Sequence, residues 1–267
     1  MSVTIEQRGA VHVVTIERPE QRNAVDPATA WALFEAFQAF EADPDARVAV
    51  LTGAGGAFCA GFDLKSAGSG EADKWIGQLG FPEDWCDPVG APLPGPMGPS
   101  RLMLSKPVIA AIEGHAVAGG MELAAWCDMR VMAGDAVTGV FCRRWGVPLI
   151  DGGTVRLPRM LGQGRANDLI LTGRPVQADE ALRIGFADRV CAPGQARQVA
   201  LVLAEDLTRF PQGCLRGDFL SARLPAAALA AALRREWVSA EAFLSEGKLG
   251  AARFAAGKGR GGDFGDI

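Results

Sequence analysis

Two glycine-framed segments, at residues 57–64 and 114–123, have the residue types and spacing of a site that stabilises negative charge. They read AFCAGFDL and GHAVAGGMEL, and each is typical of a strand end that delivers backbone N–H groups into a pocket. Two such donors would form an oxyanion hole for a carbonyl oxygen that becomes an enolate. Glu122, inside the second segment, could transfer a proton beside that oxygen. For Gly119 and Gly120 the structural alternative is a tight turn between a strand and a helix.

Composition limits the classes of protein to which the chain can belong. With 267 residues, of which 49% are hydrophobic, the chain can bury a large core as one domain, or as one domain with an appendage. A net charge of -4 gives no general attraction to nucleic acid or to anionic membranes, so we expect neither as a partner. The cysteines form no CxxC pair, and His12 and His115 have no ligand partners at metal spacing. We therefore expect no metal site, reduced thiols and a cytoplasmic protein without a leader.

The pattern of apolar residues predicts an α/β fold. Short apolar runs predict buried strands at residues 11–17, 47–53, 107–114 and 129–133. Residues 28–41 repeat apolar side chains at helical spacing, and they follow Asp26 and Pro27, a capping residue and a residue favoured at the start of a helix. After Gly194 the chain is rich in alanine and leucine and has almost no strand signal. We therefore predict a body at residues 1–194 and a helical region at residues 195–267.

Residues 66–100 differ from the rest of the chain. Prolines and glycines alternate between residues 88 and 99, so the segment is predicted to be a long loop in which no helix or central strand persists. Long loops often line a binding site, and a surface insertion is the alternative. Several apolar side chains in this loop would suit an apolar pocket: Trp75, Ile76, Leu79, Phe81 and Trp85.

A series of sequence blocks resembles the crotonase family, the enoyl-CoA hydratases and isomerases. The blocks are RPEQRNA (18–24), AFCAGFDL (57–64), KPVIAAIEGHAVAGGMEL (106–123), CD (127–128), DGGTVRLPR (151–159), LTGR (171–174), ADEALRIGFAD (178–188) and EG (246–247). Their order and spacing match the family over nearly the whole chain. The resemblance implies a spiral of ββα units, a helical C-terminal region that mediates assembly into a homotrimer or hexamer, and an acyl-CoA substrate. It implies no cofactor apart from the coenzyme A that the substrate carries.

The resemblance also assigns roles to individual residues. It implies that the backbone N–H groups of Phe62 and Gly119 form the oxyanion hole and that Glu122 is the first catalytic carboxylate. The substrate and its coenzyme A moiety would lie along residues of these blocks and one residue between them: Arg22, Ala24, Ala60, Gly61, Phe62, Asp63, Leu64 and Gly119, with Cys142 between the blocks.

Two residues decide which reaction of the family to expect. Hydratases of the family have a second glutamate where this chain has Cys142, and a thiol with an ordinary pKa of about 8.5 is a poor substitute for a carboxylate. Asp151 lies where some isomerases and a dehalogenase branch of the family use an aspartate, and it could equally cap the helix expected near Thr154. Hydration of a 2-enoyl-CoA is the family expectation, and double-bond isomerisation through Asp151 is the alternative.

Two further classes of function are alternatives. Glycine-rich turns after strands, such as TGAGG at residues 52–56, suggest a nucleotide-binding enzyme. The glycine spacing does not match a dinucleotide-binding motif, however, and no Gly-Lys-Ser/Thr element occurs. A non-catalytic scaffold or RNA-binding protein is the other alternative, since some relatives of crotonase have this role. The acidic net charge and the presence of Glu122 weigh against it.

Overall fold

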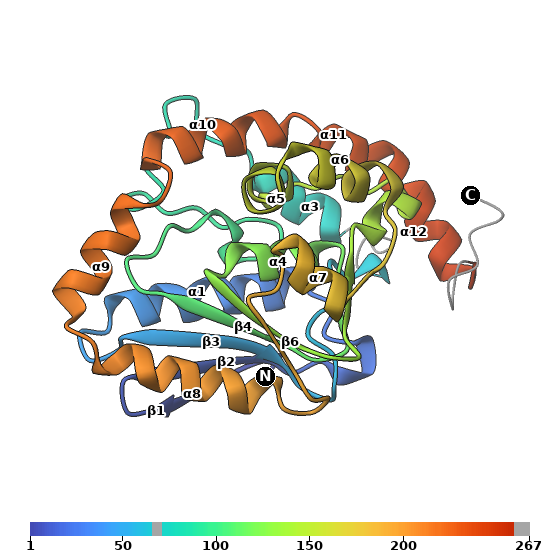
Figure 1. Cartoon of the computed structure of the whole chain (residues 1–267). Coiled ribbons are helices and arrows are strands. Elements are labelled where there is room, and N and C mark those ends of the chain that lie inside the picture. Colours follow the sequence, from blue (N-terminus) through green and yellow to red (C-terminus); the bar gives the residue numbers. More distant parts are fainter. Residues whose placement is uncertain (66–70, 259–267) are drawn as a thin grey trace.

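The computed structural model describes residues 1–65 and 71–258, and its centre is a twisted six-stranded sheet (Figure 1). The strand order is β1-β2-β3-β4-β6-β9, with β1 antiparallel to β2 and the other neighbours parallel. The bounds of these strands are β1 Val3–Arg8, β2 Val11–Ile16, β3 Val48–Gly53, β4 Val108–Ile112, β6 Met129–Ala133 and β9 Arg189–Cys191. A smaller sheet contains β5 (His115–Val117), β7 (Val137–Gly139) and β8 (Val176–Gln177) in the order β5-β7-β8.

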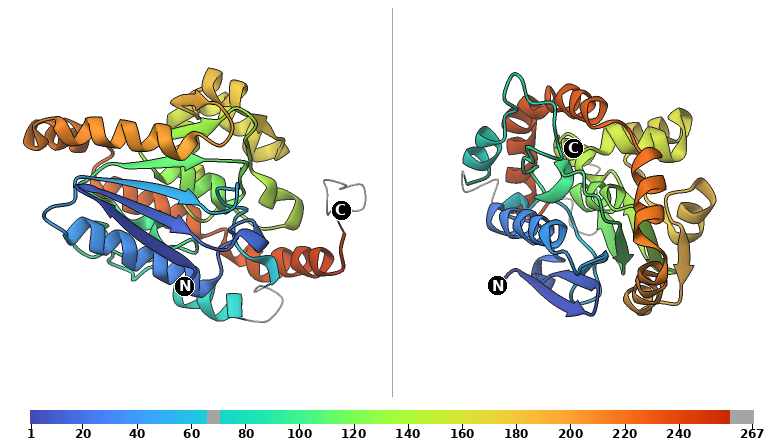
Figure 2. Two further views of the ribbon diagram at one scale, coloured as in Figure 1. Left: turned by 90° about the horizontal axis from the view of Figure 1, so that it is seen from below. Right: turned by 90° about the vertical axis from the view of Figure 1, so that its left-hand side faces the viewer.

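Helices cover both faces of the six-stranded sheet, as Figure 2 shows: α1 (Pro27–Ala42) on one side and α8 (Ala196–Arg209) on the other. This double cover explains why β3 and β4 are buried along their length and read as continuous apolar runs. The predicted cap of α1 is confirmed, because the Asp26 carboxylate accepts a hydrogen bond of 2.8 Å from the Thr29 N–H. The predicted α/β class and the predicted early strands are confirmed.

The C-terminal region is helical, as predicted. After α8 come α9 (Gln212–Ser221), α10 (Ala226–Trp237), α11 (Ala240–Ala242), a π-helical turn (Phe243–Gly247) and α12 (Lys248–Ala255). The buried alanines of α8, among them Ala200 and Ala204, belong to the same core as the sheet. The division of the chain at residue 194 stays a prediction, and residues 259–267 lie outside the described residues.

The prediction of a loop without a helix over residues 66–100 is wrong for residues 71–78. Helix α3 (Glu71–Gln78) forms there, ahead of the prolines, and buries Ala72 and Ile76 on one face. Burial of its apolar face stabilises this helix although its local helix preference is weak. The proline-rich part that follows is irregular up to the short helix η2 (Pro99–Arg101). Residues 66–70 of the predicted loop lie outside the described residues.

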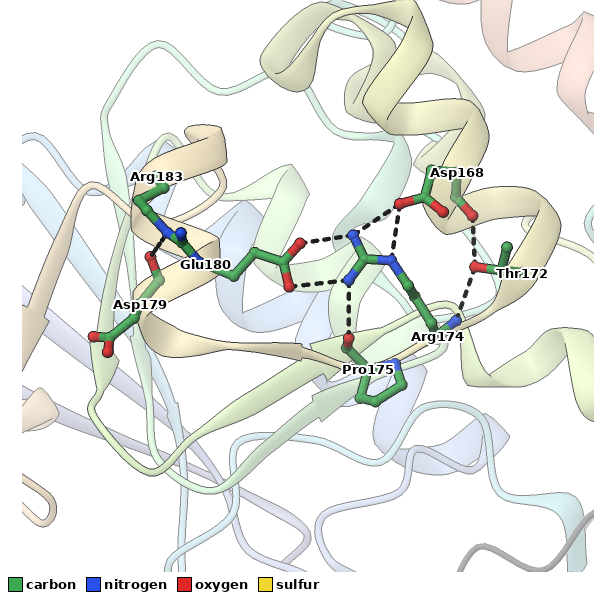
Figure 3. A network of polar contacts seen from close by, with 7 residues as sticks. All are labelled: Asp168, Thr172, Arg174, Pro175, Asp179, Glu180 and Arg183. Atoms are coloured by element: carbon green, nitrogen blue, oxygen red, sulfur yellow. Dashed lines mark hydrogen bonds and ion pairs between the residues drawn. The ribbon is translucent and has the colours of Figure 1, made fainter.

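Six further short helices occur among the described residues. They are η1 (Pro19–Gln21), α4 (Gly119–Trp126), η3 (Phe141–Trp145), α5 (Gly153–Leu161), α6 (Gln163–Thr172) and α7 (Ala178–Ile184). Arg174 joins α6 to α7 beside β8, because its guanidinium pairs with Asp168 at 2.8 Å and with Glu180 at 2.6 Å (Figure 3). No helix in residues 1–65 and 71–258 is long and apolar enough to cross a membrane.

Candidate active site

A cavity of about 940 Å³ collects nearly all of the candidate residues. Those that line it are Arg22, Ala24, Ala60, Phe62, Asp63, Leu64, Gly119, Glu122, Cys142 and Asp151. Gly61 lies behind the wall, against the segment that carries Gly119. The two segments singled out from the sequence are therefore neighbours in space. His115, on β5, also lines the cavity.

The backbone N–H groups of Phe62 and Gly119 are both available to a ligand. Phe62 lies in a short bridge with Val25, in which the Val25 N–H donates to the Gly61 carbonyl and the Asp63 N–H donates to the Val25 carbonyl, each at 2.8 Å. Gly119 is the first residue of α4, where an N–H has no partner within the helix. Within residues 1–65 and 71–258, neither N–H donates to an acceptor. A Cβ placed on Gly61 would be 3.0 Å from the Gly119 nitrogen, so the segments are in contact.

Backbone strain sits at the turn that presents Gly119. Ala118 has φ 55° and ψ -126°, a conformation that residues other than glycine rarely adopt and that costs of order 1–3 kcal/mol. The turn is held on both sides, because the Ala118 N–H donates to the Gly139 carbonyl at 2.9 Å and the Val117 N–H donates to the Cys59 carbonyl at 3.0 Å. Strain maintained by surrounding hydrogen bonds is common at functional sites. An alanine gives no sequence signal for such a conformation, so this feature was not predicted.

Glu122 is a buried carboxyl group with one oxygen held and one oxygen without a partner. Its Oε1 accepts hydrogen bonds of 2.9 Å from the N–H groups of Asp151 and Gly153, and the residue is 3% exposed. Oε2 has no hydrogen-bond partner among the described residues, and Glu122 lines the cavity. Burial, followed by the negative charges of Asp151 and Glu236, raises the pKa of Glu122 well above its usual value. A carboxyl group in this state suits proton transfer near neutral pH.

Asp151 is a second buried carboxyl group in the same cavity. Its Oδ1 accepts a hydrogen bond of 2.9 Å from the Met97 N–H and another from the Ser100 hydroxyl. Burial raises the pKa of Asp151 to about 6, although these two hydrogen bonds oppose the shift. The interpretation of Asp151 as a helix cap is wrong. Its side chain makes no cap to α5, whose first N–H groups are taken by carboxylates from two other helices.

Cys142, from η3, stands beside these carboxyl groups as an inert thiol. It is 5% exposed, and burial together with the negative charge of Glu122 raises the pKa of its thiol to about 12. A thiol with this pKa stays protonated at neutral pH and cannot act as a base.

The part of the cavity near Arg22 and His115 is polar, and residues outside the cavity hold it in place. Arg22 has φ 51° at the end of η1 and is exposed beside His115, whose pKa is lowered by burial and by the positive charge of Arg22. Behind them, the Arg18 Nη2 lies 2.9 Å from the Asp63 carboxylate, so this candidate ligand residue is already paired. The buried Asn23 donates to the Ala57 carbonyl at 2.7 Å and ties this segment to the next.

The rest of the cavity lining is largely apolar. Of the aromatic and aliphatic residues predicted from the 66–100 segment, Ile76 lines the cavity, whereas Phe81 stacks on Trp85 in a separate cluster. The other apolar lining residues include Leu64, Met97, Val147, Ile150, Phe243 and Phe254. Phe243, in the C-terminal region, contacts the Phe62 ring with centroids 5.9 Å apart. No pattern in the sequence indicated this contact. No group of possible metal ligands occurs among the residues that the structure describes.

Comparison with known proteins agrees with this geometry. The family model for enoyl-CoA hydratase/isomerase matches residues 6–92 and 100–234. A carnitinyl-CoA dehydratase from Salmonella arizonae is 38% identical over 211 residues, which are 78% of this chain and 75% of that protein. The enoyl-CoA hydratase EchA19 from Mycobacterium tuberculosis is also 38% identical over 211 residues, 76% of this chain and 73% of that protein.

Solved structures give the same result for the fold. The crystal structure of a carnitinyl-CoA hydratase from Mycobacterium avium superposes with a TM-score of 0.79 at 30% identity, covering 96% of each chain. A probable enoyl-CoA hydratase/isomerase from Mycobacterium abscessus superposes with a TM-score of 0.71 at 35% identity, again over 96% of each chain. The chain therefore belongs to the enoyl-CoA hydratase/isomerase family, has the crotonase fold, and is an enzyme of the hydratase/isomerase type.

Proposed function

We propose that the enzyme catalyses the reversible addition of water to a 2-enoyl-CoA, giving a 3-hydroxyacyl-CoA. The observation that carries the proposal is the buried Glu122 carboxyl group, which shares one cavity with the unused N–H groups of Phe62 and Gly119. In the forward direction the water oxygen bonds to C3 and one water proton goes to C2. In between, the thioester oxygen carries the enolate charge, which two fixed N–H donors stabilise.

In this proposal Glu122 and Asp151 form the carboxyl pair of the reaction. Glu122 is oriented through Oε1, and its Oε2 has no hydrogen-bond partner among the described residues. The protonated Cys142 thiol does not activate water, so the second role falls to Asp151, whose pKa of about 6 leaves it mostly ionised at neutral pH. Relatives named carnitinyl-CoA dehydratase and enoyl-CoA hydratase support water addition or removal as the reaction.

Double-bond isomerisation is the second candidate. It is favoured by Cys142, because proton transfer between the α and γ carbons needs no activated water and one or two carboxyl groups suffice. Glu122 and Asp151 would then exchange a proton with these two carbons of the same enolate. The two reactions share the oxyanion hole and differ only in the fate of the intermediate.

The substrate class follows from the walls of the cavity. The coenzyme A moiety is proposed to lie in the polar part of the cavity, near Arg22, Ala24 and the residues 60–64, and the acyl tail against the apolar part of the lining. Ile76, Ile150 and Phe243 would contact an uncharged aliphatic or aromatic tail. Assembly into a homotrimer or hexamer is part of the proposal and rests on the family.

The test assays water addition to 2-enoyl-CoA and bond migration in 3-enoyl-CoA with purified protein. Glu122→Gln keeps an oxygen that can accept both N–H groups and removes the proton-transfer group, so we expect a loss of about 10²–10⁴ in kcat with the fold intact. Asp151→Asn should lower kcat comparably, and Cys142→Ala should change it less than threefold. Full activity of Glu122→Gln, or migration without hydration, would remove hydration as the function.

A further inference from the structure

Four consecutive backbone N–H groups connect two buried carboxylates that come from distant parts of the chain. The N–H groups of Asp151 and Gly153 donate to Glu122 Oε1, both at 2.9 Å. The N–H groups between and after them donate to Glu236, from Gly152 at 2.6 Å and from Thr154 at 2.8 Å. The Thr154 hydroxyl adds a third hydrogen bond to Glu236, at 2.8 Å. Donors 151–154 thus alternate between the two carboxylates.

The helix end that carries Glu236 is itself held in place by packing contacts. It lies near the end of α10, which runs beside α5 (Figure 1), and it is 6% exposed. The ring of the next residue, Trp237, stacks on the Arg101 guanidinium at 4.4 Å. Arg101 in turn lies 3.9 Å from the Phe81 ring and donates to the Leu79 carbonyl at 2.7 Å. The end of α10 is therefore fixed against residues 79–101.

We propose that Glu236 is a positioning residue for Glu122: by holding Gly152 and Thr154 it fixes the turn whose other N–H groups orient the catalytic carboxyl group. This inference rests on the proposed role of Glu122 in proton transfer. It assigns the C-terminal region a task in the reaction, through a side chain that does not line the cavity.

A simple helix cap would not explain the arrangement. A single Ser, Thr or Asp side chain at the N-cap position satisfies the start of most helices, but here that position is Gly152, with φ 88°. The two carboxylates that replace the cap lie close enough to repel each other, and the charge of Glu236 raises the pKa of Glu122. Such repulsion costs stability, and it also favours the protonated form of Glu122, which is the form that can deliver a proton.

The charged groups around the two carboxylates determine whether loss of the Glu236 charge raises or lowers the pKa of Glu122. Asp151 and Glu236 face Glu122 as negative charges, and Cys142 faces it as a neutral thiol. The guanidinium groups of Arg101 and Arg156 face this cluster from η2 and α5 and act in the opposite direction. Loss of the Glu236 charge therefore lowers the pKa of Glu122.

The experiment compares Glu236→Gln with the wild-type enzyme and with Glu241→Gln, a matched change at an exposed residue of the same region. Glutamine keeps the shape but can no longer accept from both Gly152 and Thr154. We expect kcat to fall about tenfold, KM to stay within twofold, and the pH limb set by Glu122 to move down by about one unit. Glu241→Gln should match the wild type. An unchanged kcat and pH limb in a folded Glu236→Gln enzyme would overturn the proposal.

A second variant keeps the test decisive if Glu236→Gln does not fold. Thr154→Val removes one hydrogen bond to Glu236 and retains the charge, so kcat should fall about threefold with KM and melting temperature nearly unchanged. Wild-type kcat in Thr154→Val together with wild-type amide exchange at residues 152–154 would overturn the proposal.

The proposed function has a separate readout. If the wild-type enzyme does not hydrate enoyl-CoA, or if Glu122→Gln remains active, that function fails. Faster amide exchange at residues 152–154 in Glu236→Gln or Thr154→Val would still support the contact between Glu236 and the turn, and unchanged exchange in both variants would refute it.

Discussion

Replacing Gly61 by alanine should disable the enzyme by separating the two segments that carry the Phe62 and Gly119 N–H groups. Gly61 has φ 98°, and a Cβ there would be 2.9 Å from the Ala118 Cβ and 3.0 Å from the Gly119 nitrogen. Optimal contacts between carbon atoms are about 3.5–4.0 Å, so the segments must move apart by about 0.6 Å. Ala118 is already strained and hydrogen-bonded on both sides, so it cannot yield without displacing Gly119.

The size of the effect follows from the geometry that an oxyanion hole requires. Its donors work at about 2.7–3.1 Å from the developing charge, and a displacement of about 0.6 Å takes one donor out of that range. Loss of one donor lowers kcat by about 10²–10³, or roughly 3–4 kcal/mol in the barrier. The left-handed backbone conformation adds about 1–2 kcal/mol of folding cost for any residue with a Cβ.

Gly56→Ala is the control that separates these two effects. Gly56 has φ 80°, so alanine meets the same backbone cost, but a Cβ there has nothing within 4 Å. Both variants should lose comparable stability in urea unfolding, and only Gly61→Ala should lose the expected kcat in hydration of an enoyl-CoA. If Gly61→Ala keeps kcat within threefold of Gly56→Ala, the two N–H groups do not form the proposed site.

Two further predictions concern charge. The raised pKa of Asp151, about 6, means that the unfolded chain ionises this group first, so its contribution to stability is present at low pH and is lost as pH rises through about 6. Asp151→Asn should therefore gain stability relative to the wild type between pH 4.5 and 8, by about 2 kcal/mol, and a constant difference in urea unfolding would contradict this. Arg174→Ala opens the network of Figure 3, but the arginine side chain is 37% exposed, so solvent screening limits the loss to about 1 kcal/mol. That loss should shrink in 1 M salt with kcat unchanged, whereas a salt-independent loss would show that charge is not its cause.

The sequence predicted the elements in which local preference and burial agree. Helix α1 has a capping aspartate, a proline at its start and an apolar stripe, and all three indicate the same helix. The strands of the small sheet were not predicted, because β7 has three residues and β8 has two, too few for a periodic pattern. Helix α3 was missed because the sequence cannot show that α1 and the C-terminal helices bury its apolar face.

The residues of the candidate site also fall into those that a local sequence pattern indicated and those that it did not. Phe62, Gly119 and Glu122 were found because each belongs to a contiguous segment with a recognisable pattern, and the structure places all three at one cavity. Glu236 and Phe243 were missed because their roles depend on contacts with residues far away in the chain. Glu236, for example, meets Gly152 across a separation of 84 positions, and an isolated glutamate in a helix rich in alanine and arginine resembles a solvated one.

The two interpretations of Asp151 illustrate why a backbone site needs three-dimensional evidence. A carboxylate before two glycines and a helix is usually a cap, and the sequence could not separate that role from a catalytic one. The structure shows that carboxylates from α4 and α10 take the N–H groups of the turn. The Asp151 side chain, with its own N–H donated to Glu122, is thereby free to hydrogen-bond to Met97 and Ser100 at the cavity wall. Because both carboxylates accept hydrogen bonds from the same four peptide groups, a change at the end of α10 is expected to reach the proton-transfer group in two ways: through the backbone, which amide exchange measures, and through the charge of Glu236, which the pH profile measures.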